Sequence, residues 1–184
     1  MLYRNKKTDD PCEGKWVGVG GKFEPGETPE QCLLREVREE TGLTLNDYKF
    51  RGIINFVSDR WPDEDMYLYS ASGFDGDDVF PEAVFDRDGN ICNMINHAPR
   101  RNTETDDNNG KNIYNNNDLI SFDCNEGDLF WIPAGRILSL NLWEGDRYFL
   151  EPMISGKERI YMTCRYEGHK CVEVKNEEIY NRNE

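Results

Sequence analysis

Apolar residues recur at helical spacing in the segment 28–42, near the start of the chain. At about 100° per residue its apolar positions fall on one arc of a helix: Leu33, Leu34, Val37 and Thr41. Thr28 suits the N-cap, Pro29 suits the first helical position, and Gln31 completes a capping box. Gly42 is a natural C-terminal stop. Both ends of this predicted helix are therefore specified by local sequence.

Stretches rich in β-branched and aromatic residues predict strands on either side of this helix. Residues 15–20 alternate apolar side chains with glycine and run directly into the loop before the helix. Residues 48–57 and 66–74 have the composition of strands, and the turn residues 59–63 between them predict an antiparallel pair. Together these elements predict a mixed sheet flanked by helices, which is an α+β fold.

The last third of the chain supplies further elements of the predicted fold. Residues 126–132 are expected to form a strand entered from an acidic loop, and residues 159–175 a hairpin. Between them, a second helix should begin within residues 143–146. Four residues make up its predicted packed side: Tyr148, Phe149, Met153 and Ile154.

The segment from about 75 to 121 interrupts this pattern. Residues 79–93 predict a hairpin, whereas the asparagine-rich run after them cannot bury enough apolar surface to offset the cost of ordering it. We therefore expect an insertion within one domain that spans residues 1–184. Residues 1–4 have the character of the end of a strand, so we expect either that the numbered chain is truncated at its start or that its sheet has an open edge there.

Charge narrows the set of possible partners. The net charge of −14 and the isoelectric point near 4.6 argue against nucleic acid or an anionic membrane as a partner. No apolar run approaches the length of about 18 residues that a membrane helix needs, and no signal-like segment opens the chain. We expect a cytoplasmic monomer or homodimer. A polyphosphate ligand would need metal ions to approach so acidic a protein.

Three glutamates share one face of the predicted helix. Glu36, Glu39 and Glu40 fall within an arc of about 100° in the second half of the helix, where the helix dipole disfavours anions. A positive group should offset them. Carboxylate oxygens are hard ligands, and Mg²⁺ or Mn²⁺ typically binds through a few of them while bridging to phosphates. The alternative is a solvent-exposed acidic face without a ligand.

The spacing around these glutamates resembles the Nudix box, G-x5-E-x7-R-E-U-x-E-E-x-G-U, in which U is apolar. Every specified position is filled, in order, by Gly21, Glu27, Arg35, Glu36, Val37, Glu39, Glu40, Gly42 and Leu43. A match at all of these positions is a specific signal. The resemblance implies a metal-dependent hydrolase of nucleoside diphosphates linked to another group. It also implies a Nudix α/β/α sandwich with a catalytic loop-helix-loop, and family members usually carry a further first strand that this sequence lacks.

The resemblance assigns roles to individual residues. The implied metal ligands are four carboxylates and one backbone carbonyl: Glu36, Glu39, Glu40, Glu126 and Gly20. Asp128 is the alternative to Glu126. Either Glu36 or Glu40 would orient or deprotonate the attacking water, and the sequence leaves both open. Lys22 is expected to face phosphate.

Two further positions of the box have an expected supporting role. Glu27 is expected to pair with Arg35 and so to hold the loop that begins at Gly21 on the helix. Under this interpretation the pair supports the site structurally and does not contact the substrate.

The later segment LWEGDR narrows the resemblance to MutT-type 8-oxo-dGTP diphosphatases, in which a tryptophan and a nearby aspartate hold the purine. Trp143 and Asp146 match those positions. An indole offers stacking area, and an acidic side chain can bond the donor-rich edge of an oxidised guanine. A core aromatic and a helix cap are the alternative roles. The sequence departs from some of these relatives at two positions, with Gly145 where they carry an aspartate and Val17 where they carry an asparagine.

These patterns lead to one functional prediction and two alternatives. The prediction is Mg²⁺-dependent hydrolysis of 8-oxo-dGTP to 8-oxo-dGMP and pyrophosphate, a nucleotide-pool sanitation reaction that protects DNA. The first alternative is a Nudix hydrolase of another substrate, such as ADP-ribose, a sugar nucleotide or a canonical dNTP. The second is a nucleotide-binding sensor without activity, which the intact box disfavours.

Overall fold

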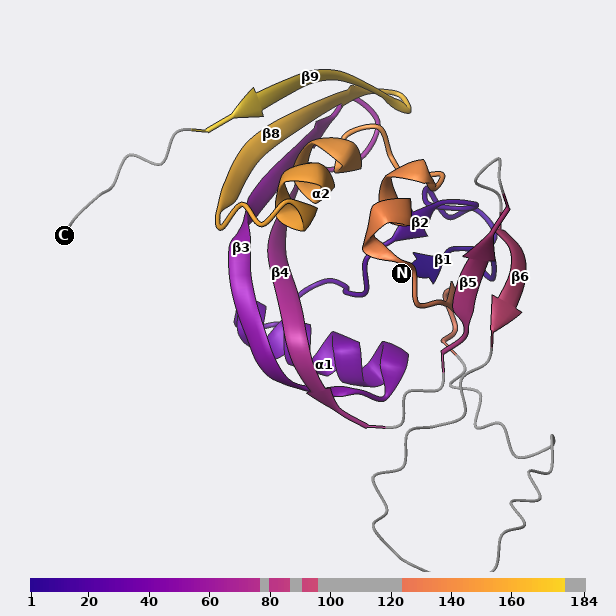
Figure 1. Cartoon of the computed structure of the whole chain (residues 1–184). Coiled ribbons are helices and arrows are strands. Elements are labelled where there is room, and N and C mark those ends of the chain that lie inside the picture. Colours follow the sequence, from indigo (N-terminus) through magenta and orange to yellow (C-terminus); the bar gives the residue numbers. More distant parts are fainter. Residues whose placement is uncertain (77–79, 87–90, 96–123, 178–184) are drawn as a thin grey trace, which may run out of the picture.

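A computed structural model describes residues 1–76, 80–86, 91–95 and 124–177 of the chain (Figure 1). Within them lies a curved mixed sheet with helices packed on it, so the predicted α+β class is confirmed. No helix in these ranges is long and apolar enough to cross a membrane.

The larger sheet has the strand order β4-β3-β8-β9. Its strands are β3 (Thr44–Ser58), β4 (Glu64–Asp75), β8 (Ile160–Glu167) and β9 (Lys170–Asn176). The antiparallel β3–β4 pair and the C-terminal hairpin form as predicted. The two pairs are joined by a parallel ladder between β3 and β8, in which Ile54 pairs with Met162. This ladder makes the sheet mixed.

A smaller sheet has the order β2-β1-β7, with β1 at Leu2–Tyr3, β2 at Trp16–Val17 and β7 at Asp128–Leu129. The strands predicted at 15–20 and 126–132 are therefore shorter than expected. Beyond β7 the chain turns to another partner, because the Trp131 amide bonds to the Pro81 carbonyl at 2.9 Å. β1 is paired on both sides, so β2 and β7 are the outer strands of this sheet.

The hairpin predicted near residues 79–93 is present. It consists of β5 (Glu82–Phe85) and β6 (Ile91–Ile95), which pair antiparallel. A bridge from Glu82 to Trp131 and a 3.1 Å bond from the Ala83 amide to the Trp131 carbonyl tie β5 to the segment after β7. The asparagine-rich run of the expected insertion lies outside the described residues.

The first helix, α1, spans Pro29–Thr41 and has the ends predicted from sequence. The Thr28 hydroxyl accepts from the Gln31 amide at 3.2 Å, and the Gln31 side chain accepts from the Thr28 amide at 2.9 Å. Gly42 ends the helix in the left-handed conformation, with φ of 71°. A short 3-10 helix, η1 (Ala134–Ser139), precedes the second helix, α2, at Asp146–Ile154.

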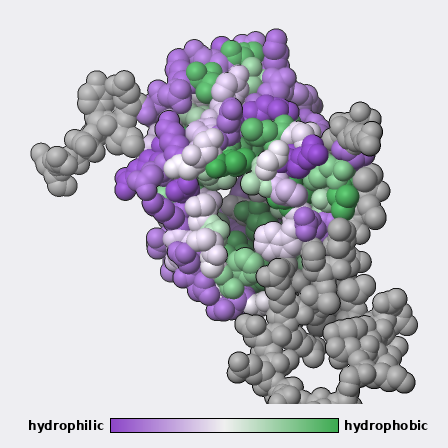
Figure 2. Space-filling model, viewed as in Figure 1, coloured by the Kyte–Doolittle hydropathy of each residue, from purple (hydrophilic) through white to green (hydrophobic). Residues whose placement is uncertain are grey.

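Two apolar clusters hold these elements together. One lies where α2 covers the larger sheet, and its most buried members are Ile54, Ile160, Met162, Cys164 and Phe149. The other joins α1 to the smaller sheet through Leu2, Val37, Leu43 and Leu129. Figure 2 shows a hollow with apolar walls on the face between α1, β4 and η1.

Three packing predictions for the helices are wrong. Tyr148 and Ile154 of α2 are 55% and 38% exposed, and Leu150 packs beside Phe149 in their place. Leu34 of α1 is 36% exposed, because the small sheet contacts the helix through Leu33 and Val37. The apolar arc of each helix is wider than the surface that actually covers it.

Candidate active site

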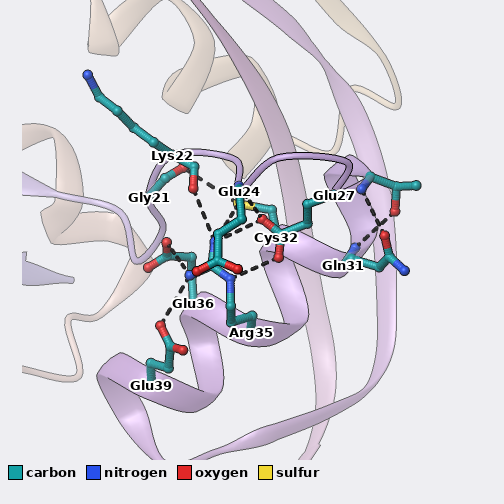
Figure 3. A network of polar contacts seen from close by, with 10 residues as sticks. Gly21, Lys22, Glu24, Glu27, Gln31, Cys32, Arg35, Glu36 and Glu39 are labelled. Carbon is teal, nitrogen blue, oxygen red and sulfur yellow. Dashed lines mark hydrogen bonds and ion pairs between the residues drawn. The ribbon is translucent and has the colours of Figure 1, made fainter.

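One arginine of α1 holds the preceding loop against the helix. The guanidinium of Arg35 makes two bonds to the Glu27 carboxylate, Nε to Oε1 at 2.8 Å and Nη2 to Oε2 at 2.9 Å (Figure 3). Nη2 also donates to the Lys22 carbonyl at 3.1 Å. Paired bonds from a planar guanidinium fix direction as well as distance. The predicted pair of Glu27 with Arg35 is thus present, and it ties the loop to the helix.

The same arginine contacts two glutamates of the helix. Arg35 Nη1 lies 2.7 Å from Glu36 Oε1 and 3.1 Å from Glu39 Oε2. Figure 3 shows both carboxylates turned toward the guanidinium. Arg35 is therefore the positive group that offsets the repulsion between these two side chains. Glu39 is 61% exposed, whereas the Glu36 side chain is 14% exposed and lies under the loop.

Gly21 is placed directly against Glu36. An added Cβ at Gly21 would lie 2.2 Å from Glu36 Oε1 and 2.5 Å from its Cδ. Only glycine lets the backbone approach the carboxylate so closely. By contrast, a Cβ at Gly18, earlier in the same loop, would meet no atom within 4 Å.

Glu40 is the buried carboxylate of the helix. It is 8% exposed, and its Oε2 accepts the Gly20 amide at 3.1 Å. Burial raises the pKa of Glu40 to about 7, and the negative charge of Glu36 acts in the same direction. The Gly20 hydrogen bond and the charges of Arg4 and Lys7 lower this pKa only in part. A buried carboxylate with one hydrogen bond is well suited to a cation.

The donor chemistry of this site fits a hard divalent cation. Glu36 and Glu40 act on each other electrostatically, and both lie against the backbone of the Gly20–Gly21 loop. Among the described residues no three acidic, histidine or cysteine side chains converge closely enough to hold a metal as they stand. Glu36 and Glu39 are turned to Arg35. For all the predicted ligands to coordinate one metal site, Glu36 and Glu39 must therefore turn away from Arg35.

Glu126 and Lys22 lie in surroundings that the sequence did not predict. Glu126 forms ion pairs with Arg4 and Lys7, which sequence reasoning did not assign to the site. Asp128, the alternative ligand, lies 3.4 Å from Lys6. Lys22 is 88% exposed, binds Glu64 at 2.9 Å and points away from the glutamates of α1 (Figure 3).

Trp143 is part of an aromatic cluster at the N-terminal end of α2. Its indole stacks on His169 with centroids 5.5 Å apart and planes 7° from parallel, and Trp61 meets it edge-on at 5.8 Å. Trp143 Nε1 donates to Cys12 Sγ at 3.4 Å, and Lys15 Nζ lies 5.4 Å from the ring centroid. A base that stacks on Trp143 must therefore share the ring with these neighbours.

Asp146 is the first residue of α2 and is not its cap, which is Gly145. Burial raises the pKa of the Asp146 carboxyl to about 7, while a hydrogen bond from the Trp143 backbone and the charge of Lys15 act in the opposite direction. Near neutral pH this group is a mixture of acid and carboxylate. It can therefore donate as well as accept a hydrogen bond.

The raised pKa of Asp146 predicts a pH-dependent stability difference. The folded pKa exceeds the ordinary value, so the neutral form favours folding, and this stability is lost as pH rises toward about 7. Asparagine does not titrate, so Asp146→Asn should keep its stability as the wild type loses this contribution. The free energy of unfolding of the variant minus that of wild type should therefore rise by about 1.4 kcal/mol per pH unit between about pH 5 and about pH 7. Urea unfolding at both pH values in EDTA measures this. A difference that stays constant between the two pH values would contradict it.

Comparison with known proteins identifies the class to which this fold and site belong. The model of the NUDIX domain matches residues 1–92, half of the 184-residue chain. The chain therefore belongs to the Nudix family. With its glutamate helix it is a Nudix hydrolase, an enzyme that acts on nucleoside diphosphate derivatives.

Individual relatives cover different lengths of the chain. An uncharacterized Nudix hydrolase of Bacillus subtilis, YvcI, is 26% identical over 156 residues, 85% of this chain and 75% of the relative. An 8-oxo-dGTP diphosphatase of Proteus vulgaris is 40% identical over 55 residues, 30% of this chain and 46% of the relative. The chain matches less than half the length of this diphosphatase.

A solved structure shares the fold. The crystal structure of a mutator MutT protein from Bacillus halodurans superposes with a TM-score of 0.63 at 19% identity, covering 96% of this chain and 87% of that one. At this identity the likeness establishes the fold and leaves the substrate open.

Proposed function

We propose that the protein is a Mg²⁺-dependent pyrophosphohydrolase that converts 8-oxo-dGTP to 8-oxo-dGMP and pyrophosphate. The observation that carries the hydrolytic part is the burial of Glu40 beside Glu36, under a glycine loop held by Arg35. A buried carboxylate whose charge is only partly compensated is costly, so its presence supports a ligand of opposite charge. Mn²⁺ is the alternative cation.

The residues that would hold the cation are those of the glutamate helix and its loop. Glu36, Glu40 and the Gly20 carbonyl form its centre, and Glu39 and Glu126 complete the proposed set. When bound, the cation would neutralise phosphate charge and favour ionisation of a bound water. Arg35 would keep Glu36 oriented, and Gly21 would let the loop backbone approach it. Glu36 or Glu40 would orient the attacking water or accept its proton.

Base recognition is proposed for Trp143 and Asp146. The indole supplies stacking area, and the Asp146 carboxyl, whose pKa lies near 7, can match either a donor or an acceptor on a purine edge. The Proteus vulgaris relative supports the choice of 8-oxo-dGTP. Lys22 is proposed to reach phosphate after leaving Glu64. In this role the protein would clear oxidised nucleotides from the cytoplasm before they enter DNA.

A nucleotide panel tests this proposal. 8-oxo-dGTP, dGTP, other dNTPs, ADP-ribose and a sugar nucleotide are incubated with Mg²⁺, and release of pyrophosphate, monophosphate and orthophosphate is measured. We expect the highest kcat/KM for 8-oxo-dGTP, with pyrophosphate as the product. Equal rates for 8-oxo-dGTP and dGTP would overturn the substrate assignment and leave hydrolysis standing. Nucleotide binding without any product would favour the sensor alternative.

A further inference from the structure

Two positively charged side chains contact the carboxylate of Glu126. Arg4 Nη1 contacts Oε2 of this carboxylate, and Lys7 Nζ contacts Oε1. Arg4 is anchored on its other side, because its Nε and Nη2 both lie 2.7 Å from Asp10 Oδ2. The Arg4 side chain is 15% exposed and that of Glu126 is 27% exposed, so solvent screens this contact only partly. Both oxygens that a metal would use are therefore engaged.

The fold brings these residues together. In the smaller sheet Tyr3 pairs with Asp128, which places Arg4 next to the loop that carries Glu126. Gly127 permits the approach, because a Cβ there would lie 1.9 Å from the Tyr3 carbonyl oxygen. The Arg4 backbone is fixed by bonds to Lys15 and Gly14 at 2.9 and 2.7 Å. The ion pairs thus join two segments of the chain whose backbones are held in place.

The positively charged side chains of Arg4 and Lys7 also act on Glu40 of α1. Their charges are among those that influence Glu40, so Arg4 and Lys7 lie within electrostatic reach of both Glu40 and Glu126. A triphosphate bound at this site would bring several negative oxygens toward them. Phosphate is a strong acceptor for arginine and lysine, and it can replace a carboxylate as their partner.

We propose that Arg4 and Lys7 are positioning residues that hold Glu126 away from the metal until a polyphosphate draws them off. Glu126 then becomes free to join Glu36 and Glu40. This inference rests on the proposed function of the site and adds an order of events to it. Because binding effects are reciprocal, metal and nucleotide should each strengthen the binding of the other.

The direct test is Mn²⁺ affinity without nucleotide, measured from the electron paramagnetic resonance signal of free Mn²⁺. Lys7→Gln releases one oxygen of Glu126 and should tighten Mn²⁺ binding about 10-fold. Lys6→Gln is the matched control, since it removes the same charge one position away. Lys6 contacts Asp128 at 3.4 Å and the Cys124 carbonyl at 3.1 Å. We expect less than about a twofold change for this control.

A double-mutant cycle separates release of Glu126 from a general charge effect. In a Glu126→Gln background, Lys7→Gln should no longer tighten Mn²⁺ binding. Mn²⁺ affinity is then measured with and without the α,β-methylene analogue of dGTP. The increase that the analogue causes should be smaller in Lys7→Gln than in Lys6→Gln, because in Lys7→Gln one oxygen of Glu126 is already released. The analogue itself chelates Mn²⁺ to the same extent with both variants, so this effect cancels when the two variants are compared.

Two results would overturn the proposal. One is an equal change in Lys7→Gln and Lys6→Gln, and the other is an effect of Lys7→Gln that survives Glu126→Gln. Failure of the proposed function gives a different result, namely no hydrolysis of any nucleotide in the panel. The Mn²⁺ cycle has its own readout and can succeed or fail independently of that outcome.

Discussion

Glu40→Gln is expected to lower the turnover of nucleoside triphosphate hydrolysis at least about 100-fold while the protein stays folded. Glutamine keeps the size of the side chain and can still accept the Gly20 amide through its oxygen. It removes the negative charge that a cation needs and cannot accept a proton from water. Steady-state rates with saturating Mg²⁺ and nucleotide measure the loss.

Stability distinguishes this loss from unfolding. Burial raises the pKa of Glu40 to about 7, so above that pH the metal-free wild type carries a buried charge that glutamine does not. The variant should therefore unfold at an equal or higher urea concentration than wild type in EDTA at about pH 8. Glu30→Gln is the matched control, because this residue is exposed in the first turn of the same helix and should keep wild-type turnover. Full activity in Glu40→Gln would refute the assignment of the site.

Gly21→Ala is expected to reduce turnover by about 100-fold, since displacing a catalytic group by about 1 Å has an effect of this order. The new methyl group would meet the Glu36 carboxylate at 2.2 Å. Because the obstructing atoms belong to the end of a flexible side chain, that side chain should move and the loop should stay in place. The melting temperature should change little while kcat falls.

Gly18→Ala controls for the loss of a glycine in the same loop. Its added Cβ meets no atom within 4 Å, so activity close to wild type is expected. Parallel measurement of kcat and thermal unfolding for both variants separates displacement of Glu36 from a general stiffening of the loop. Equal losses in the two variants would show that Gly21 has no special relation to Glu36.

The sequence alone determined the helix α1, which carries the three glutamates, and both of its ends. The capping box at Thr28 and Gln31 and the stop at Gly42 involve residues close in the chain, so local physical chemistry decides them. The box spacing also determined the family and the pairing of Glu27 with Arg35. Strand composition predicted both hairpins of the larger sheet, because each joins neighbouring segments.

Only the tertiary structure decided which groups meet across long stretches of chain. The parallel ladder of β3 with β8 and the central place of β1 depend on pairing between distant segments. Helical spacing places Glu36, Glu39 and Glu40 on one face, yet it does not show that Glu40 is buried while Glu39 is exposed. That difference depends on what packs over each carboxylate.

The ion pairs of Glu126 show the same limit most clearly. Arg4 and Glu126 are 122 positions apart, and no pattern within either segment indicates that they meet. Their contact follows from the pairing of β1 with β7 and from the close approach that Gly127 allows. Spacing along a chain determines what one element presents, whereas side-chain partners are determined by how the elements pack, which local sequence does not encode.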